Sequence, residues 1–272
     1  MITAARDTKV EDDSASRAYV SLSEAQDAAV PEQVRSKRAF LFSSIPPSLQ
    51  WRLQVDDVSL YSVTESRLAT RMSEAILSAL ERSFAGQPGA AARARASAVT
   101  DACACVGGNV LSFAATFAAV HAVEWSPQRA AMLANNARLA GAAVALGAGL
   151  PPAARAHQAA LGAALPPPTL PATVTVHCGD YSCPHRGLAT SLTQDAVFLD
   201  PPWGGTDYGA AALLDMFLGP TDVADLIAAL TGAAPGGGWG LPGPGWWPSR
   251  HPSTTTPRAC CASWQLGAAA RS

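Results

Sequence analysis

The sequence predicts an α/β protein built around an open parallel β-sheet, and two observations lead to this expectation. Four short segments have the character of buried strands with helical patterns around them, at residues 99–103, 119–123, 173–177 and 196–199. A carboxylate lies at or just after the end of each strand: Asp101, Glu124, Asp180 and Asp200. Because the carboxyl ends of parallel strands meet at one edge of a sheet, these acids are expected to line one ligand-binding crevice.

A glycine pair follows the first strand and opens a helix that is expected to run to Phe117. Glycine lets the backbone approach a ligand closely, and the first turn of a helix offers N–H groups without partners inside the helix. The strand end and this loop supply the first candidate cofactor-binding residues, which are Asp101, Val106, Gly107, Gly108 and Asn109.

Glu124 at the second strand end is followed by Trp125 and by a helix-start signal, a serine N-cap before a proline. An acid at this place hydrogen-bonds a ribose in nucleotide-binding βαβ units. After the third strand, Asp180 and Tyr181 again combine a carboxylate with an aromatic ring. Glu124, Trp125, Asp180 and Tyr181 are therefore further candidates for cofactor binding.

The fourth strand end carries the most informative run, DPPWGG at residues 200–205. Proline fixes the backbone and removes a donor, so the carbonyl groups here point outward instead of pairing in a sheet. A carboxylate, free carbonyls and an indole suit a planar base whose amino group is held and alkylated. The candidate catalytic residues are Asp200, Pro201, Pro202 and Trp203. A plainer interpretation exists, because Pro-Pro and Gly-Gly also form turns and acids often cap helices.

Composition divides the chain into four parts. A polar, disordered segment (1–38) is followed by a helical extension (39–86). A binding domain (95–234) contains a low-complexity loop insertion (142–171), and an irregular tail (235–272) ends the chain. The extension is expected to contain a helix over residues 64–84, which repeats apolar side chains every four residues, and a further helix is expected over residues 221–230. The tail shows no strand pattern, so we expect the sheet to lack its last strands.

The chain has 272 residues and a formal net charge of −2, which argues against a broad cationic surface for nonspecific duplex binding. It shows neither an apolar run near the ~20 residues of a membrane span nor a signal-peptide core, so we expect a soluble, intracellular protein with no membrane partner. The six cysteines lack zinc-type spacing. One cluster is a candidate metal site: His177, Cys178, Cys183 and His185. Reduced thiols with no metal are the favoured interpretation of these residues.

These motifs, in this order, resemble those of class I S-adenosylmethionine-dependent methyltransferases and specifically the trimethylguanosine synthase family, which methylates the 7-methylguanosine cap of small nuclear and nucleolar RNA at guanine N2. The resemblance covers residues 51–232 and implies a Rossmann-like three-layer sandwich. The runs that carry it are DACACVGGN (101–109), VEWSP (123–127), CGDY (178–181) and DPPWGGTDY (200–208), with YSVT (61–64) resembling the entry to the amino-terminal helix.

The resemblance implies S-adenosyl-L-methionine as the cofactor, with Gly107 and Gly108 beside its amino-acid part, Glu124 on the ribose and Asp180 at the adenine amine. It further implies that Trp203 stacks on the 7-methylguanine while Asp200 and the Pro201 carbonyl orient the amine. The implied partner is 7-methylguanosine-capped RNA, contacted by Trp203, Gly204, Arg52 and Thr64. Candidates for the RNA triphosphate, by location only, are Lys37, Arg38, Arg52 and Arg67. Localisation by resemblance is the nucleus, with the cytoplasm as a second compartment.

The chain departs from the family pattern at several positions, and these leave two alternatives open. Cys105 replaces the first loop glycine, and a Cβ there is tolerated only if φ is negative. Cys103, Ser126, Glu65 and Thr206 also differ from the family's residues. One alternative is a methyltransferase for another amine, such as adenine N6 or a protein amide. The other is a degenerate, non-catalytic relative.

Overall fold

The computed structural model describes residues 16–21, 23–152, 154–156, 158, 167–182, 188–201, 216–219, 221–231 and, through the backbone, 259–262. Its helices are α1 (Glu24–Ala28), α2 (Glu32–Leu41), α3 (Ser59–Ser62), α4 (Ser66–Ser83), α5 (Ala90–Arg95), α6 (Gly108–Thr116), α7 (Pro127–Leu139) and α9 (Val223–Thr231), with 3-10 turns η2 (Pro47–Arg52) and η3 (Leu188–Thr190). Its strands are β1 (Ala18–Tyr19), β2 (Val55–Asp56), β3 (Ala98–Asp101), β4 (Ala119–Glu124), β5 (Ala143–Leu146), β6 (Thr173–Cys178), β7 (Ala196–Leu199), β8 (Phe217–Leu218), β9 (Thr221–Asp222) and β10 (Ala259–Ala262).

The main sheet is parallel, and its strand order is β10-β7-β3-β4-β6-β5. The chain starts the sheet at β3, moves outward through β4, and later returns to place β7 on the other side of β3. This reversal creates a topological switch point, beside which open α/β sheets bind their ligands. The expected α/β fold with a parallel sheet is confirmed.

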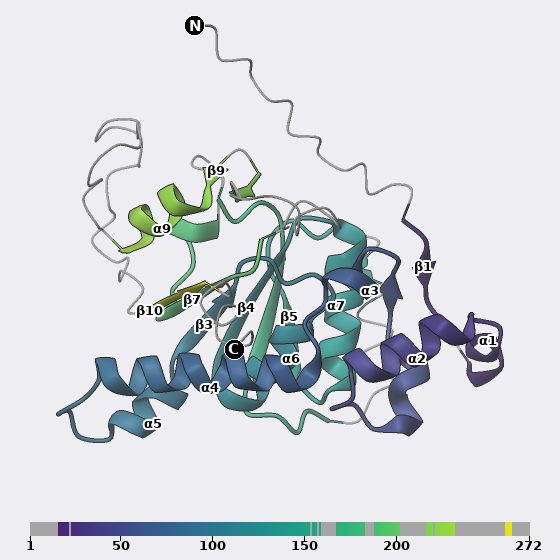
Figure 1. The fold of residues 1–272 in the computed structure, drawn as a ribbon, viewed down its shortest axis with the longest axis horizontal. Coiled ribbons are helices and arrows are strands. Elements are labelled where there is room, and N and C mark those ends of the chain that lie inside the picture. Colours follow the sequence, from purple (N-terminus) through teal and green to yellow (C-terminus); the bar gives the residue numbers. More distant parts are fainter. Residues whose placement is uncertain are drawn as a thin grey trace, which may run out of the picture.

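Helices cover both faces of the sheet, and successive residues of a strand point to opposite faces. On β7, Ala196 and Phe198 belong to the larger core shared with α4, α6 and α7, whereas Val197 and Leu199 pack with α9. Phe198 also meets Phe113 of α6 edge-on, with ring centroids 5.5 Å apart. Figure 1 shows α4, α6 and α7 grouped together and α9 apart from them, beside β7 and β10. The arrangement is a three-layer sandwich.

The structure describes β1, α1 and α2 within residues 16–21 and 23–38, which corrects the expectation of disorder over the whole of residues 1–38. Strand β1 pairs antiparallel with β2, and α1 and α2 follow it. Arg38, 2% exposed, donates from Nη2 to both carboxylate oxygens of Asp27 at 2.8 Å. A buried ion pair between helices thus organises a segment whose composition alone suggested no packed structure.

Two further boundaries differ from expectation. Within the supposed loop insertion 142–171, β5 pairs with β6 as a parallel edge strand, and Leu150 is buried. Within the supposed irregular tail, β10 pairs with β7 and extends the sheet by one strand. A four-residue edge strand has too little periodicity to stand out among alanines and glycines, so both strands escaped detection. Across the described parts of the chain, no helix has both the length and the apolar character that crossing a bilayer requires.

Candidate functional site

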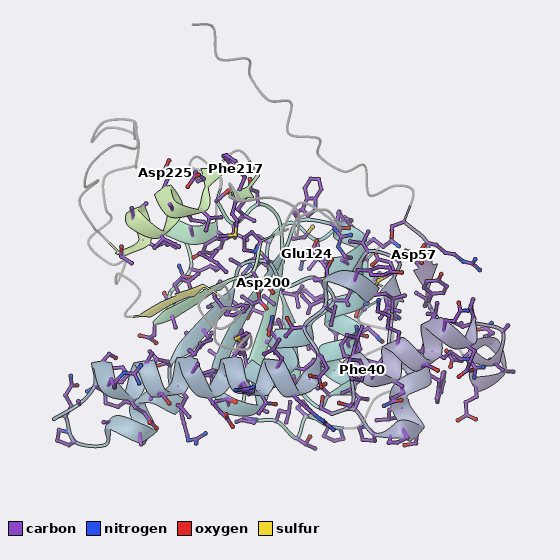
Figure 2. The ribbon with its side chains drawn as sticks, viewed as in Figure 1. Phe40, Asp57, Glu124, Asp200, Phe217 and Asp225 are labelled. Carbon is purple, nitrogen blue, oxygen red and sulfur yellow. The ribbon has the colours of Figure 1, made fainter. Side chains whose placement is uncertain are left out.

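Carboxylates gather at the carboxyl edge of the sheet, as the strand pattern predicted. Asp101 ends β3 and pairs in register with Ala122 of β4, while Asp200 directly follows β7 on the other side of the switch point. Glu124 ends β4, and Asp180 comes two residues after the end of β6. Figure 2 shows Glu124 and Asp200 at the same end of the sheet. The edge is therefore strongly acidic.

Asp101 is the most perturbed of these acids. It is 1% exposed, and burial raises the pKa of its carboxyl group to about 8, with Asp200 and Glu124 adding repulsion. Its Oδ1 accepts a hydrogen bond from the Cys103 backbone N–H at 3.2 Å, which opposes the rise. The Asp101 carboxyl group is therefore neutral at pH 7. A cation bound nearby would lower its pKa again, because an opposite charge favours the ionised form.

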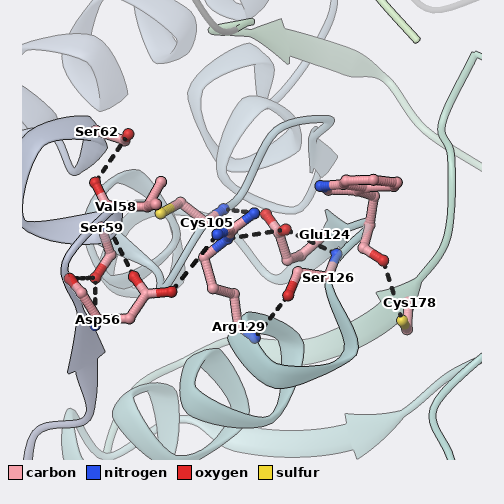
Figure 3. Close-up of polar contacts among 10 residues, drawn as sticks. Asp56, Val58, Ser59, Ser62, Cys105, Glu124, Ser126, Arg129 and Cys178 are labelled. Atoms are coloured by element: carbon pink, nitrogen blue, oxygen red, sulfur yellow. Dashed lines mark hydrogen bonds and ion pairs between the residues drawn. The ribbon is translucent and has the colours of Figure 1, made fainter. Parts of the chain in front are cut away.

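Glu124 is held by donors from its own protein (Figure 3). Its Oε2 accepts from the Cys105 backbone N–H at 2.9 Å, and its Oε1 accepts from the Ser126 N–H at 2.9 Å and from Arg129 Nε at 3.2 Å. Burial raises the pKa of Glu124, and Arg129 lowers it. A carboxylate offers about four lone-pair positions, so one position on Oε2 remains for a ligand donor.

Arg129 joins Glu124 to the amino-terminal segment, the stretch over residues 52–64 that precedes α4. The sequence does not predict this link. Its Nη1 lies 3.5 Å from Oδ2 of Asp56 on β2, and both residues are buried. Figure 3 shows Arg129 between the two carboxylates. A buried arginine five residues after Glu124 could have signalled this contact, but its partner lies 73 positions upstream in Asp56.

The helix α7 also binds the amino-terminal segment through two asparagines. Asn136, 0% exposed, accepts from the Gln54 N–H and donates to the carbonyls of Gln54 and Val106, at 2.9–3.0 Å. Asn135 donates to the Arg52 carbonyl at 3.0 Å. Val106 is 0% exposed, with its side chain in the core and its carbonyl bonded to Asn136. Its side chain and carbonyl therefore anchor the glycine loop, and its role as a ligand contact stays a prediction.

The glycine loop adjoins Thr64. A Cβ on Gly108 would lie 2.7 Å from the Thr64 carbonyl oxygen, and a Cβ on Gly107, where φ is 109°, would lie 2.8 Å from Leu133 Cδ1. Asn109 donates from Nδ2 to Thr64 Oγ1 at 3.0 Å, whereas its buried Oδ1 has no partner. The close approach that Gly108 permits is thus to Thr64, whereas Gly107 approaches Leu133 of α7, and Thr64 supports the glycine loop.

Cys105 has a φ of 48°, in the left-handed region. The sequence predicts that a side chain at this position requires a negative φ, and the structure does not meet that condition. The backbone keeps a glycine-like turn, which directs the Cys105 N–H at Glu124. Burial raises the pKa of the Cys105 thiol above its ordinary value, which favours the protonated thiol.

The residues after β6 have different roles from one another. Asp180 accepts from the N–H and hydroxyl of Ser182, both at 2.8 Å, and a Cβ on Gly219 would lie 2.9 Å from its Oδ2. Tyr181 is 1% exposed, packs in the α9 core and accepts from Gln194 Nε2 at 2.9 Å. Its ring is a core group, which corrects its assignment as a cofactor contact.

The remaining candidate residues are partly exposed, buried or outside the described residues. Trp125 is 52% exposed next to Glu124, and the Arg52 guanidinium lies over the Trp51 ring at 5.7 Å. Arg38 is removed from the RNA-binding candidates by its buried pairing with Asp27. Pro201, the residue after Asp200, is buried. Pro202, Trp203 and Gly204 lie outside the described residues.

His177 and Cys178 belong to the cluster weighed as a metal site, and Cys183 and His185 lie outside the described residues. Where the structure describes the chain, no three His, Cys, Asp or Glu side chains come together as a metal-binding group. His177 Nε2 instead lies 3.3 Å from Nδ1 of His121 on the adjacent strand.

Residues 96–149 match the sequence model of a family described as RNA cap guanine-N2 methyltransferase. The match confirms the resemblance to the trimethylguanosine synthase family over these residues, which contain Asp101, the glycine loop and Glu124; Asp180 and Asp200 lie beyond it. A crystal structure from Porphyromonas gingivalis W83, assigned as a methyltransferase, aligns at 13% identity over 62% of this chain and 31% of that protein, with a TM-score of 0.36. This chain thus spans about a third of that protein's length.

Proposed function

We propose that this chain is an S-adenosylmethionine-dependent methyltransferase that methylates guanine N2 of 7-methylguanosine-capped small nuclear or nucleolar RNA, its partner in the nucleus. The observation that carries the proposal is the group of strand-end carboxylates at the switch point, next to the glycine loop. Asp101, the loop and Glu124 lie within the segment that matches the cap guanine-N2 family. Asp200 completes the edge at the start of the DPPW run.

The described residues fit the proposed cofactor chemically. S-adenosylmethionine carries positive charge at its sulfonium and ammonium groups, and the sheet edge supplies the carboxylates Asp101, Glu124 and Asp200. Its own carboxylate suits the first turn of α6, where backbone N–H groups lack helical partners. Among the described residues no donor reaches the buried Oδ1 of Asn109 in that turn, so this acceptor can take a donor from the cofactor. The bound cofactor supplies an electrophilic methyl group.

This chain's residues then contribute mainly by orienting the reactants. In this proposal Asp200 accepts a hydrogen bond from the guanine amine, and Pro201 provides a carbonyl without a competing N–H of its own. Trp203 supplies an indole that attracts the positive charge of 7-methylguanine. Holding two reactants at reactive distance lowers the barrier by reducing the entropy lost at the transition state. Asp200 and Trp203 are thus the residues on which guanine recognition depends.

The decisive experiment incubates the protein with S-adenosylmethionine labelled in its methyl group and a 7-methylguanosine-capped oligonucleotide. We expect label on guanine N2, loss of turnover in Trp203→Ala, and cofactor affinity in that variant close to wild type. Unmethylated capped RNA is the matched substrate control. Label on that RNA or on adenine instead points to another amine, and absence of cofactor binding by calorimetry leaves the degenerate relative.

A further inference from the structure

We propose that Arg129 and Asp56 are positioning residues for Glu124, so that the amino-terminal segment sets the geometry of the cofactor pocket. The identity of the ligand that Glu124 receives rests on the proposed function. The positioning itself is a property of this chain's own contacts, and it can be tested without any ligand.

The three side chains form a continuous buried chain of charges. Arg129 Nε lies 3.2 Å from Glu124 Oε1, and Nη1 lies 3.5 Å from Asp56 Oδ2. The exposed fractions are 7% for Arg129, 1% for Asp56 and 6% for Glu124. The planar guanidinium presents several donors in a rigid fork, so one side chain can address two carboxylates from different elements. Lysine, a single point charge, cannot reproduce that geometry.

Asp56 is itself fixed and gives the bridge a rigid outer end. Its Oδ1 accepts from the Ser59 N–H at 2.7 Å, and its own N–H donates to Ser59 Oγ at 2.8 Å. Its strand β2 pairs with β1, and the preceding Gln54 is bonded on both backbone groups by Asn136. Movement of the amino-terminal segment would therefore be transmitted to Arg129 and from it to Glu124.

The charge balance around Glu124 makes Arg129 decisive. Among the described groups that act on Glu124 or feel its charge, Arg129 is the cation; the others are Asp101, Cys103, Cys105 and Cys178 from β3, the loop after β3 and β6. Asp56 of β2 pairs with Arg129 itself. Without the guanidinium, burial and neighbouring acids disfavour the ionised carboxylate. A protonated Glu124 would accept the Cys105 and Ser126 N–H groups less well, and a ribose hydroxyl less well too.

The test measures calorimetric affinity for S-adenosylhomocysteine from pH 5.5 to 9 in wild type, Arg129→Gln, Arg129→Lys, Asp56→Asn and Asp57→Asn. For Arg129→Gln we expect the affinity for S-adenosylhomocysteine to fall at least tenfold at pH 7. This difference from wild type should become smaller as the pH rises, because alkali ionises Glu124 again. Arg129→Lys should restore the pH profile in part. Asp56→Asn should lose affinity at every pH. Asp57, the exposed neighbour bonded to the Tyr19 hydroxyl, is the matched control and should resemble wild type.

An Arg129→Gln loss that is equal at every pH, or no loss, would overturn the positioning role. If the wild type binds no S-adenosylhomocysteine, the proposed function fails, and the positioning is decided by amide hydrogen exchange. The Cys105 N–H should then exchange at least tenfold faster in Arg129→Gln than in wild type, while the Phe117 N–H, bonded to the Phe113 carbonyl at 2.9 Å, keeps its rate. Unchanged Cys105 protection refutes the proposal. Should Arg129→Gln fail to fold, Asp56→Asn, which retains the Arg129–Glu124 pair, takes the same exchange test.

Discussion

The backbone N–H of Cys105 donates to Glu124 Oε2 at 2.9 Å, and this bond fastens the loop after β3 to the end of β4. The loop follows β3, which is the parallel neighbour of β4, so the bond crosses the edge at which the sheet's acids gather. Cys105 makes it from a left-handed backbone conformation, with φ at 48°. The geometry of the loop is therefore that of a glycine, held by a residue with a side chain.

Replacing Cys105 by glycine should stabilise the protein relative to replacement by alanine. Both variants lose the thiol, but alanine keeps the Cβ that makes left-handed backbone unfavourable by about 1–2 kcal/mol. Glycine avoids that cost, but its more flexible unfolded chain lowers the stability of the folded protein by about 0.5–1 kcal/mol. We expect Cys105→Gly to exceed Cys105→Ala by about 1 kcal/mol in urea unfolding. Equal stability of the two variants would show that φ at position 105 is unstrained.

Gly108→Ala should destabilise the protein by about 1–3 kcal/mol and weaken cofactor binding, since overpacking forces the backbone to shift. The new Cβ would lie 2.7 Å from the Thr64 carbonyl oxygen and 2.8 Å from Val63 Cγ1. Gly179→Ala is the control, because a Cβ there meets nothing within 4 Å. Its change in unfolding free energy should stay within about 0.5 kcal/mol. A Gly108→Ala protein as stable as the control would contradict the contact.

The sheet edge could be predicted from sequence because its signals are local. Glu124 ends an apolar strand and precedes a serine N-cap, and Ser126 Oγ does accept from the Arg129 N–H at 3.4 Å. The contacts that fix the edge are not local. Asn136 and Gln54 are 82 residues apart, and no periodicity in either segment specifies their pairing. Strand β1 and the helices α1 and α2 could not be predicted for the same reason, because they depend on the pairing of β1 with β2 and on the Arg38–Asp27 ion pair.

Asp101→Asn should stabilise the free protein, and more so as the pH rises. The pKa of Asp101 is raised from 3.8 to about 8, so its stabilising contribution is fully present below pH 3.8 and is lost as pH rises through 8. Asparagine removes this dependence, at up to about 1.4 kcal/mol per pH unit within that window. Thermal unfolding from pH 5 to 9 measures the difference. Exposed Glu74→Gln is the control for loss of a charge. A variant advantage that stays constant with pH would mean that Asp101 ionises normally.

His177 should make the protein sensitive to acid. Burial and then repulsion from His121 lower its pKa from 6.5 to about 4. A base with a lowered folded pKa contributes stability above pH 6.5 that is lost as pH falls towards 4. We expect the imidazole to titrate near pH 4 by NMR, and His177→Gln to flatten the fall in Tm between these values. A titration midpoint at or above 6.5 would show that His177 is not held neutral by its surroundings.

Asn136→Ala should cost more stability than Asn135→Ala, although the two amides are neighbours on α7. Removing Asn136 leaves the Gln54 N–H and the carbonyls of Gln54 and Val106 without their partners, and each buried unsatisfied group costs about 1–3 kcal/mol. Removing Asn135 frees the Arg52 carbonyl, which is only half-buried and can bind water. We expect about 3 kcal/mol or more against about 1 kcal/mol in urea unfolding. Because Asn136 holds Val106 as well as Gln54, its loss should also raise the Kd for S-adenosylhomocysteine, whereas Asn135→Ala should not. Equal costs in both assays would mean that the amino-terminal segment is attached to the cofactor loop by other contacts.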